Sequence, residues 1–316
     1  MNEKIKVSVF CLAYNHEKYI RNALEGFVKQ KTNFAYEVLI HDDASTDNTA
    51  KIIKEYEEKY PNIIKPIYQT ENQYSQGIKI SKKYILPRAK GKYFAWCEGD
   101  DYWTDPLKLQ KQVDFLENNP EYSTCAHRVK MITIDNGWEA IIPKIDEAKE
   151  FSVDEIIRGG ALFQMSSLVM RKCVYEKKPS CFSAKGFGDI QLYIHGAASG
   201  KFMVLGDVMS VYNHGTEGSW TKRTKGITDA EVLHTSEKIK MFTVMNEYYE
   251  KKYDQSIQYA LNREYFNLAK HRGAKKEMRK PEYREFYNKY RKEKVKAFLR
   301  NVFPWLSAVR KFFGVR

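Results

Sequence analysis

Short apolar runs alternate with amphipathic segments through the first part of the chain. Such runs between polar segments are typical of buried strands, and they predict four strands, over 5–13, 36–41, 63–68 and 93–97. Between the strands, apolar residues recur three or four positions apart. This spacing predicts helices over 16–30 and 78–89, and a further helix that begins near Thr46 or Asp47.

The pattern changes after the fourth strand. Asp105-Pro106 predicts a helix that begins with proline in its first position. Further strands are predicted over 122–134, 161–170 and 202–212, with a short helix over 189–198, and the chain becomes helical from Asp229. The alternation predicts an α/β fold with a mostly parallel sheet and helices on both faces. We place a domain boundary near Lys225, which gives domains 1–225 and 226–316.

The charge of the chain is concentrated at its end. The net charge is +13, and the segment 270–316 holds 16 Lys or Arg and 4 Glu, so that segment alone carries 16 − 4 = +12. A basic segment on a neutral body predicts an anionic partner, either phospholipid head groups or nucleic acid. Apolar residues also recur through 294–316, which predicts a helix in the plane of an anionic membrane, kinked at Pro304. The alternative is a helix docked on protein.

The cysteines and the apolar runs indicate the cellular compartment of the protein. Five cysteines without a Cys-x-x-Cys pair favour a reducing compartment over a disulfide framework or zinc site. The first residues lack a signal-peptide pattern, and no run approaches 18 uncharged apolar residues. We expect a cytoplasmic protein that can associate peripherally with the inner face of the cell membrane.

Acidic residues follow the predicted strands. Asp42 and Asp43 follow the second strand, and Glu98, Asp100 and Asp101 follow the fourth. Ligands of such sheets bind beyond the carboxyl ends of the strands. Carboxylates gathered there repel one another unless a cation lies among them, and hard oxygen ligands suit Mg²⁺ or Mn²⁺. The alternative for 98–101 is a surface turn that caps the next helix.

Three segments together carry a family resemblance: Val7–Asn15, Val38–Thr49 and Gly91–Trp103, the last ending in Glu-Gly-Asp-Asp-Tyr-Trp. Their order and spacing resemble the family 2 glycosyltransferases of GT-A fold, and the last motif resembles a bacterial branch of that family. The resemblance covers residues 5–220.

The resemblance implies roles for single residues. Tyr14 would stack on the base of a nucleotide-sugar donor, and Asp43 would accept a hydrogen bond from a uracil ring nitrogen. Asp100 and Asp101 would hold the ribose and the metal-bound diphosphate, with Asp101 as the metal ligand. Glu98 stands where many members have Asp, and it is a second candidate ligand. Taken singly, Tyr14 also fits a packing residue and Asp43 a turn residue.

The second half of the predicted site departs further from the family. Asp189 resembles the general base that takes the proton of the acceptor hydroxyl; the alternative is a helix cap. His214 follows Asn213 directly, whereas the family often has Arg, one further residue and then His. His214 is therefore a candidate for the metal or a phosphate, or a structural residue. The segment 215–226, with Lys222 and Arg223, is predicted to be a mobile loop over the diphosphate.

These features predict an inverting, metal-dependent glycosyltransferase. It would move a sugar from a nucleotide sugar, a UDP sugar by resemblance, to a hydroxyl of a surface glycan or lipid-linked acceptor. One alternative is another nucleotide-sugar enzyme, although Tyr14–Glu17 stands where a nucleotidyltransferase has a basic Gly-rich loop. Others are an inactive homologue that binds nucleotide, and a nucleic-acid-binding protein that acts through its basic tail. That last reading leaves the carboxylates unexplained, so we expect no nucleic-acid partner. The oligomeric state is open.

Overall fold

The computed structural model describes residues 4–159, 162–179, 181, 188–219, 222, 226 and 228–302, without the side chains of 297 and 300–302. The chain divides into two compact units, residues 1–224 and residues 225–316. Each unit is described by itself below.

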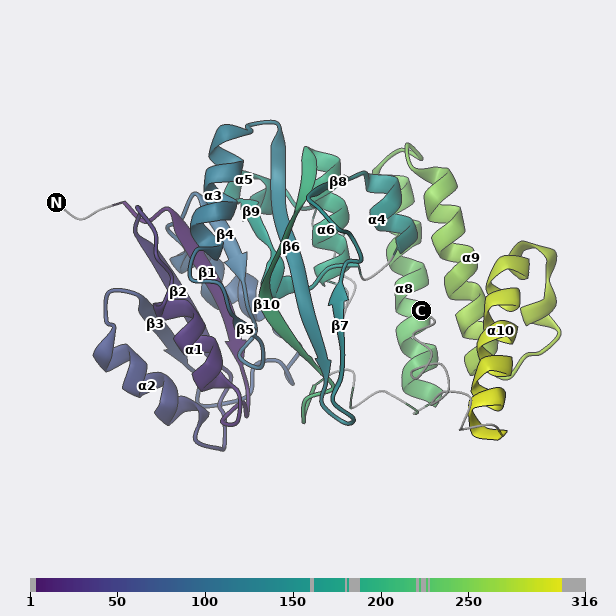
Figure 1. Cartoon of the computed structure of the whole chain (residues 1–316), viewed down its shortest axis with the longest axis horizontal. Coiled ribbons are helices and arrows are strands. Elements are labelled where there is room, and N and C mark those ends of the chain that lie inside the picture. Colours follow the sequence, from purple (N-terminus) through teal and green to yellow (C-terminus); the bar gives the residue numbers. More distant parts are fainter. Residues whose placement is uncertain are drawn as a thin grey trace, which may run out of the picture. The chain divides into compact units, whose positions relative to one another are not determined.

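The first unit is built on a sheet whose first four strands are parallel. In space they follow the order β3 (Ile64–Tyr68), β2 (Tyr36–Asp42), β1 (Val7–Ala13) and β4 (Tyr93–Trp96) (Figure 1). One face is covered by α1 (Ile20–Val28), α2 (Thr49–Lys59) and α3 (Lys108–Asn118), whose apolar residues share one buried cluster with the strands. The predicted α/β architecture is confirmed.

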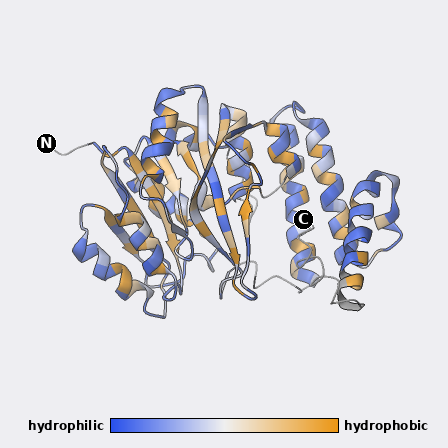
Figure 2. Ribbon diagram, viewed as in Figure 1, coloured by the Kyte–Doolittle hydropathy of each residue, from blue (hydrophilic) through white to orange (hydrophobic). Residues whose placement is uncertain are grey.

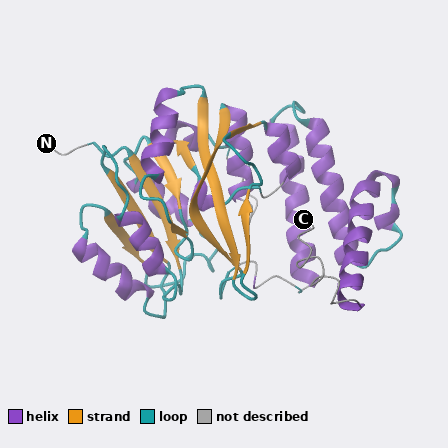
Figure 3. Cartoon of the chain, in the orientation of Figure 1, coloured by secondary structure: helices purple, strands orange, loops and turns teal. Residues whose placement is uncertain are grey.

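The remaining strands make the sheet mixed rather than mostly parallel (Figure 3). Beyond β4 lie β9 (Val169–Arg171), β6 (Tyr122–Thr133), β10 (Lys201–His214) and β5 (Tyr102–Trp103). Strands β9 and β5 pair antiparallel with their neighbours, whereas β6 and β10 run parallel to each other. Two short strands pair at the side: β7 (Trp138–Ile142) with β6, and β8 (Lys149–Phe151) with β10, both antiparallel.

Two predicted elements have a different form. The segment predicted as a helix over 78–89 is a π-helical turn, η1 (Ser81–Ile85), followed by a 3-10 turn, η2 (Leu86–Arg88), because Pro87 interrupts regular helical hydrogen bonding. The strand predicted over 161–170 is wrong for most of its length. There the chain makes a 3-10 turn, η3 (Met165–Ser167), and joins the sheet only at β9.

The helix predicted to begin at Asp105-Pro106 begins later, at Lys108. The Asp105 carboxylate accepts the Leu107 N–H (2.8 Å) and the Asp105 carbonyl accepts the Lys108 N–H (3.2 Å). Asp105 therefore closes a turn ahead of the helix, and Pro106 lies in that turn.

Among the described residues, this unit also holds α4 (Val153–Gly159), α5 (Lys172–Glu176) and α6 (Gly188–Ser199). In α5, Tyr175 packs its ring against Phe10, Phe94 and Trp96, with centroid distances of 5.4–6.0 Å. These residues belong to the face of β1 and β4 that the large apolar cluster does not use, so helices cover both faces of the parallel strands.

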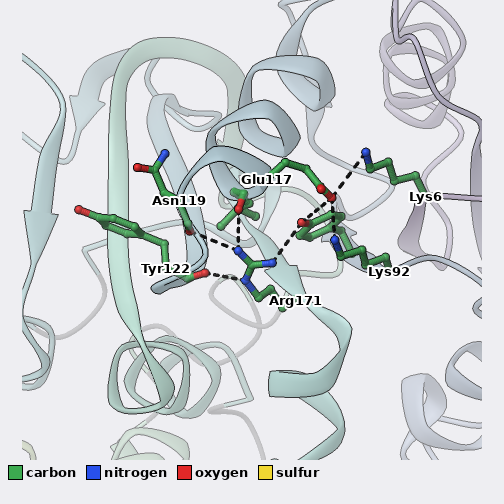
Figure 4. Close-up of polar contacts among 8 residues, drawn as sticks. Lys6, Lys92, Glu117, Asn119, Tyr122 and Arg171 are labelled. Atoms are coloured by element: carbon green, nitrogen blue, oxygen red, sulfur yellow. Dashed lines mark hydrogen bonds and ion pairs between the residues drawn. The ribbon is translucent and has the colours of Figure 1, made fainter.

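A polar network ties the amino ends of the strands together (Figure 4). The Arg171 guanidinium donates to the carbonyls of Leu116 (2.6 Å), Asn119 (3.3 Å) and Tyr122 (2.7 Å), and to the Tyr93 hydroxyl (3.2 Å). That hydroxyl donates to Glu117 (2.8 Å), which also pairs with Lys92 (2.9 Å) and Lys6 (3.5 Å). Each charge in the network has an opposite or polar partner.

The second unit is helical, as the sequence predicted. It consists of α8 (Thr228–Tyr248), α9 (Asp254–His271) and α10 (Arg284–Val302), with 3-10 turns η4 (Glu277–Arg279) and η5 (Pro281–Tyr283) before α10. Glu264 is buried, and its carboxylate pairs with Lys238 (3.1 Å) and Arg263 (3.0 Å), which links α8 to α9. Helix α10 is mostly hydrophilic, with few hydrophobic residues among the charged ones (Figure 2). Within the described part of the chain, no helix is both long enough and apolar enough to cross a bilayer.

Candidate functional site

The carboxyl ends of β1, β2 and β4 meet at one edge of the sheet. Ala13 is in register with Asp42, and the chain after β2 returns to β1 through the Asp43 N–H, which donates to the Ala13 carbonyl (2.9 Å). On the other side of β1, the Gly99 N–H donates to the Leu12 carbonyl (2.9 Å). The three acidic or aromatic segments of the sequence are therefore neighbours.

Hydrogen bonds that involve side chains join the turn after β1 to the turn after β2. Asn15 and Ala44 both adopt positive φ angles, 55° and 62°. The Asn15 side-chain oxygen accepts the Thr46 N–H (2.8 Å), and the Asn15 N–H donates to the Ser45 hydroxyl (3.0 Å). Asn tolerates this left-handed backbone better than most residues, but Ala44 gains no such contact and is strained. The two turns are therefore joined by hydrogen bonds from both the backbone and the side chain of Asn15.

Tyr14 and Asp43, the predicted base-binding residues, differ in environment. The Tyr14 side chain is 44% exposed, which leaves its ring free to stack. Asp43 is only 3% exposed, and its two carboxylate oxygens accept the N–H groups of Gln73 (2.8 Å) and Tyr74 (3.0 Å). Asp43 therefore anchors the chain after β3. Each of its oxygens has a second lone pair with which to accept a ligand hydrogen bond.

The segment after β4 holds two carboxyl groups that no Lys or Arg of the described residues pairs with: Glu98, which is partly buried, and Asp101, which is buried. Burial, the neighbouring Asp100 and then Asp189 raise the pKa of Glu98 to about 8. Burial, Asp100 and Glu98 raise the pKa of Asp101 well above its ordinary range. In the described part of the chain, no Lys or Arg forms an ion pair with Glu98, Asp100 or Asp101. Burial and the neighbouring carboxyl groups therefore disfavour the charged forms of Glu98 and Asp101, and a positive charge bound close to them would favour those forms.

The end of β10 and the residues after it hold this segment in place. The Asn213 N–H donates to an Asp101 carboxylate oxygen (2.9 Å), and the Asn213 side chain donates to the Asp100 carbonyl (2.6 Å). The Thr216 hydroxyl donates to the Asp100 carboxylate (2.7 Å). Thr216 belongs to the segment 215–226 that was predicted to be a loop over the diphosphate, but its contact with Asp100 was not predicted, because it joins residues 116 positions apart.

His16 is a second residue that the sequence analysis missed. A Cβ atom at Gly99 would lie 2.8 Å from His16 Nδ1 and 3.0 Å from Ile20. Gly99 is therefore required by lack of space, not by a left-handed backbone. Burial lowers the pKa of His16, opposed by Asp100, Asp47 and Asp42, so the His16 ring lies beside the acidic segment. Its position after Tyr14-Asn15 was the only available signal.

Asp189 lies in the first turn of α6, where its carboxylate also accepts the Ile190 N–H (2.8 Å). Its negative charge raises the pKa of Glu98 and of the buried Tyr193, whose pKa also responds to Glu98 and Asp101. The structure thus brings Asp189 into electrostatic range of the acidic segment. Both the helix-cap role and the general-base role fit this position.

His214 ends β10, and its ring lies against that of Tyr212, with centroids 5.8 Å apart. Its Nδ1 is buried and has no hydrogen-bond partner in the structure. Of the predicted loop 215–226, Lys222 lies 3.8 Å from Asp135, whereas Trp220 and Arg223 lie outside the described residues. The role of His214 as a ligand stays a prediction.

The donor set suits a divalent cation that is shared with phosphate. No group of three or more His, Cys, Asp and Glu side chains within the described residues is arranged to hold an ion by itself. Mg²⁺, however, is commonly bound through one or two carboxylates together with substrate phosphates. The unneutralised carboxyls of Glu98 and Asp101 fit that mode, so the residues are compatible with a cation that arrives with a nucleotide diphosphate.

Several known proteins are similar to this chain. An uncharacterized protein of Mycobacterium tuberculosis, Rv1520, is 38% identical over 214 residues, which is 68% of this chain and 60% of that protein. The aligned region thus spans less than two thirds of that relative. WfaP of Escherichia coli, named as a UDP-Glc:α-D-GlcNAc-diphosphoundecaprenol β-1,3-glucosyltransferase, is 34% identical over 35% of this chain and 41% of its own.

Solved structures share the fold at low sequence identity. Staphylococcus aureus TarS 1–349, in complex with UDP-GlcNAc, has a TM-score of 0.53 at 19% identity and covers 84% of this chain and 81% of its own. The mannosyltransferase PcManGT of Pyrobaculum calidifontis, in complex with GDP-Man and Mn²⁺, has a TM-score of 0.54 at 14% identity. The match covers 100% of this chain and 89% of PcManGT. The model of the family "Glycosyl transferase family 2" matches residues 8–169. The chain therefore belongs to glycosyl transferase family 2.

Proposed function

We propose that this chain is an inverting glycosyltransferase that uses a nucleotide-sugar donor, with UDP as the nucleotide. The observation that carries the proposal is the convergence of Glu98, Asp100 and Asp101 within electrostatic range of Asp189. Among the described residues, no Lys or Arg forms an ion pair with Glu98, Asp100 or Asp101. Family membership and a fold shared with nucleotide-sugar complexes support it. The Glu-Gly-Asp-Asp-Tyr-Trp motif favours a bacterial branch of the family. We assign catalysis to residues 1–225.

In the proposed mechanism, Tyr14 stacks on the base and Asp43 accepts its ring N–H. Asp100 binds the ribose. Asp101 would hold Mn²⁺ or Mg²⁺, with Glu98 and His214 as further ligand candidates; when bound, the cation supplies Lewis-acid stabilisation to the leaving diphosphate.

Asp189 accepts the proton of the acceptor hydroxyl. The acceptor oxygen forms a bond to the anomeric carbon from the face opposite the diphosphate. The bond from that carbon to the phosphate oxygen breaks, and the nucleoside diphosphate leaves. A single displacement of this kind inverts the anomeric centre.

The acceptor is proposed to be a surface glycan or a lipid-linked sugar. WfaP, a relative in this family, is named for an acceptor of the second kind. Inactive nucleotide binding and a nucleotidyltransferase activity remain the rival outcomes of the experiment below.

The test is a thermal-shift screen of the full chain with UDP and GDP sugars, with and without Mn²⁺, because a ligand of the folded state raises the melting temperature. The proposal expects one nucleotide sugar to act only with Mn²⁺. Asp101→Asn should lose both this shift and transfer. Asp189→Asn should keep the shift and lose transfer about a thousandfold or more. Equal donor binding and equal activity in the two variants would contradict the assignment.

We further propose that α10 binds an anionic membrane surface. Val295, Phe298 and Leu299 are 55%, 63% and 42% exposed and lie on one helical face. Lys294 and Lys296 lie among them, and residues 303–316, which continue the predicted amphipathic segment, lie outside the described residues. Basic residues beside an exposed apolar face favour a membrane over nucleic acid. This would place the enzyme at the inner face of the cell membrane, close to lipid-linked acceptors.

Sedimentation with vesicles tests this surface. The full chain should bind phosphatidylglycerol vesicles and not phosphatidylcholine vesicles, and added salt should weaken binding. Phe298→Glu should reduce binding about tenfold or more. Leu233→Glu is the matched control, because Leu233 in α8 is equally exposed, at 63%, yet lies outside the basic segment. Equal loss in both variants would refute α10 as the docking surface.

A further inference from the structure

The hairpin of β6 and β7 carries an exposed tryptophan that the proposed site does not use. Thr133 and Trp138 are paired across the hairpin, and the Trp138 N–H donates to the Asn136 side chain (3.0 Å), which fixes the turn. Trp138 is 55% exposed, whereas Trp96 and Trp103 are 5% and 3% exposed. A tryptophan that keeps more than half its surface in water contributes little to the core, and its ring face is open to a ligand.

Strand register places Trp138 in one row with the end of β10. His214 is in register with Thr133, and Thr133 with Trp138. Residues paired in this way direct their side chains to the same face of a sheet. Neighbouring strands lie about 4.8 Å apart, so the Trp138 backbone lies roughly 10 Å from that of His214.

The same strand end is fixed to the acidic segment. Asn213 and Thr216 form three hydrogen bonds of 2.6–2.9 Å with Asp100 and Asp101. These two residues flank His214 and Gly215 in the chain. The position of Trp138 is therefore set, through β6 and β10, relative to the carboxylates that would bind the donor diphosphate. A distance of about two strand spacings leaves room for one or two sugar rings.

The two faces of the hairpin differ in chemistry. Trp138 shares its face with Thr133, Ala140 and Met131, and the residue directly opposite it on β6 is the small Thr133, so no large side chain faces the indole ring across that pair. The opposite face carries Ile141 and the ion pair of Lys130 with Glu139 (2.9 Å). Only the Trp138 face combines an open aromatic ring with alignment to His214.

We propose that Trp138 is a binding residue of the acceptor site, on which a pyranose ring of the acceptor glycan stacks. The apolar C–H face of a pyranose fits the flat indole ring, and the ring hydroxyls stay free to bind water or polar side chains. The inference rests on the proposed function, because it assigns the acceptor of that same reaction. It places a sugar, not the lipid or phosphate of an acceptor, against β7.

The test compares three full-length proteins: wild type, Trp138→Ala and Ile141→Ala. Ile141 is 41% exposed on the same strand but on the opposite face, so its variant controls for loss of an apolar side chain from the hairpin. The probes are the methyl β-glycosides of glucose, galactose and N-acetylglucosamine, with cellobiose and chitobiose. Binding is followed by saturation-transfer NMR in the presence of the donor nucleotide, and donor binding by thermal shift.

If a sugar stacks on Trp138, at least one probe should bind the wild type and Ile141→Ala equally well. The same probe should bind Trp138→Ala about tenfold more weakly, which corresponds to about 1.4 kcal/mol. Trp138→Phe should recover most of the loss. Donor binding should be the same in all variants. The inference is overturned if no probe binds the wild type, or if Trp138→Ala and Ile141→Ala behave alike. Failure of the proposed function would be seen separately, as absence of any nucleotide-sugar shift in the wild type.

Discussion

Carboxyl groups have opposite surroundings at the two ends of the parallel strands. At the amino end, Glu117 is paired with lysines and with the Tyr93 hydroxyl, and these partners lower its pKa to about 2. At the carboxyl end, Glu98 has no cation beside it, and burial with neighbouring Asp100 raises its pKa to about 8. The first arrangement stabilises the fold, whereas the second stores repulsion that a bound cation would relieve. The same residue type thus belongs to a structural network at one end and to the proposed ligand site at the other.

The largest expected effect comes from breaking the amino-end network. Arg171→Met keeps an unbranched side chain but leaves the carbonyls of Leu116, Asn119 and Tyr122 without their donor. We expect a loss of about 3 kcal/mol in the free energy of unfolding, measured by urea denaturation. Lys92→Met removes only an ion pair on a lysine that is 57% exposed, and should cost less than about 1 kcal/mol. Similar losses in the two variants would show that the network adds nothing beyond surface charge.

A second, pH-dependent effect should have opposite signs at the two ends. Because the pKa of Glu98 is raised on folding, its contribution to stability is lost as pH rises from its ordinary value of about 4.3 to about 8. Glu98→Gln should therefore raise the melting temperature of the metal-free protein by several degrees at pH 8 and by little at pH 4.5.

Glu117 should show the reverse dependence. Its lowered pKa stabilises the fold above about pH 4.3, and that stability is lost as pH falls toward 2. Glu117→Gln should lower the melting temperature at pH 7 and converge with wild type near pH 2. Parallel pH profiles for the two variants would contradict the contrast between the ends.

The smallest effect concerns backbone strain at the carboxyl end. Ala44 holds a φ of 62° without a compensating side-chain contact, so Ala44→Gly should stabilise the protein by about 0.5–1 kcal/mol in chemical denaturation. Asn15→Gly should instead destabilise it, because Asn15, at a φ of 55°, bonds the Thr46 N–H through its side chain. Stabilisation by both changes would mean that the side chain of Asn15 does not hold the two turns together.

The sequence predicted the four parallel strands well, because each apolar run is bounded by polar residues. It failed where the chain pairs over long distances or in irregular turns. Strand β7 was missed although Asn136-Gly137 is a strong hairpin signal before an apolar segment. The strand expected over 161–170 failed because Ser166 and Ser167 are buried through side-chain hydrogen bonds in a 3-10 turn, which apolar periodicity cannot reveal.

The residues of the candidate site also fall into those that the sequence could predict and those that it could not. Tyr14, Asp43 and the 98–101 segment follow strands and could be placed from the sequence. The residues that hold the 98–101 segment could not be placed in this way, because Asn213 and Thr216 are more than 110 residues away from it in the chain. Nor could the sequence reveal that Asp43 already anchors Gln73 and Tyr74.

Strand β10 has a consequence for how the protein can be divided. The family match ends at residue 169, and β10 begins at residue 201, so the matched portion excludes the strand that supplies the Asn213 N–H to Asp101. A fragment cut at the limit of that match would expose the edge of β6 and release the acidic segment from its last support. Shortened versions of this chain, and chimaeras that exchange the half proposed to bind the donor, should therefore be joined after Thr216 rather than at residue 169, where the family match ends.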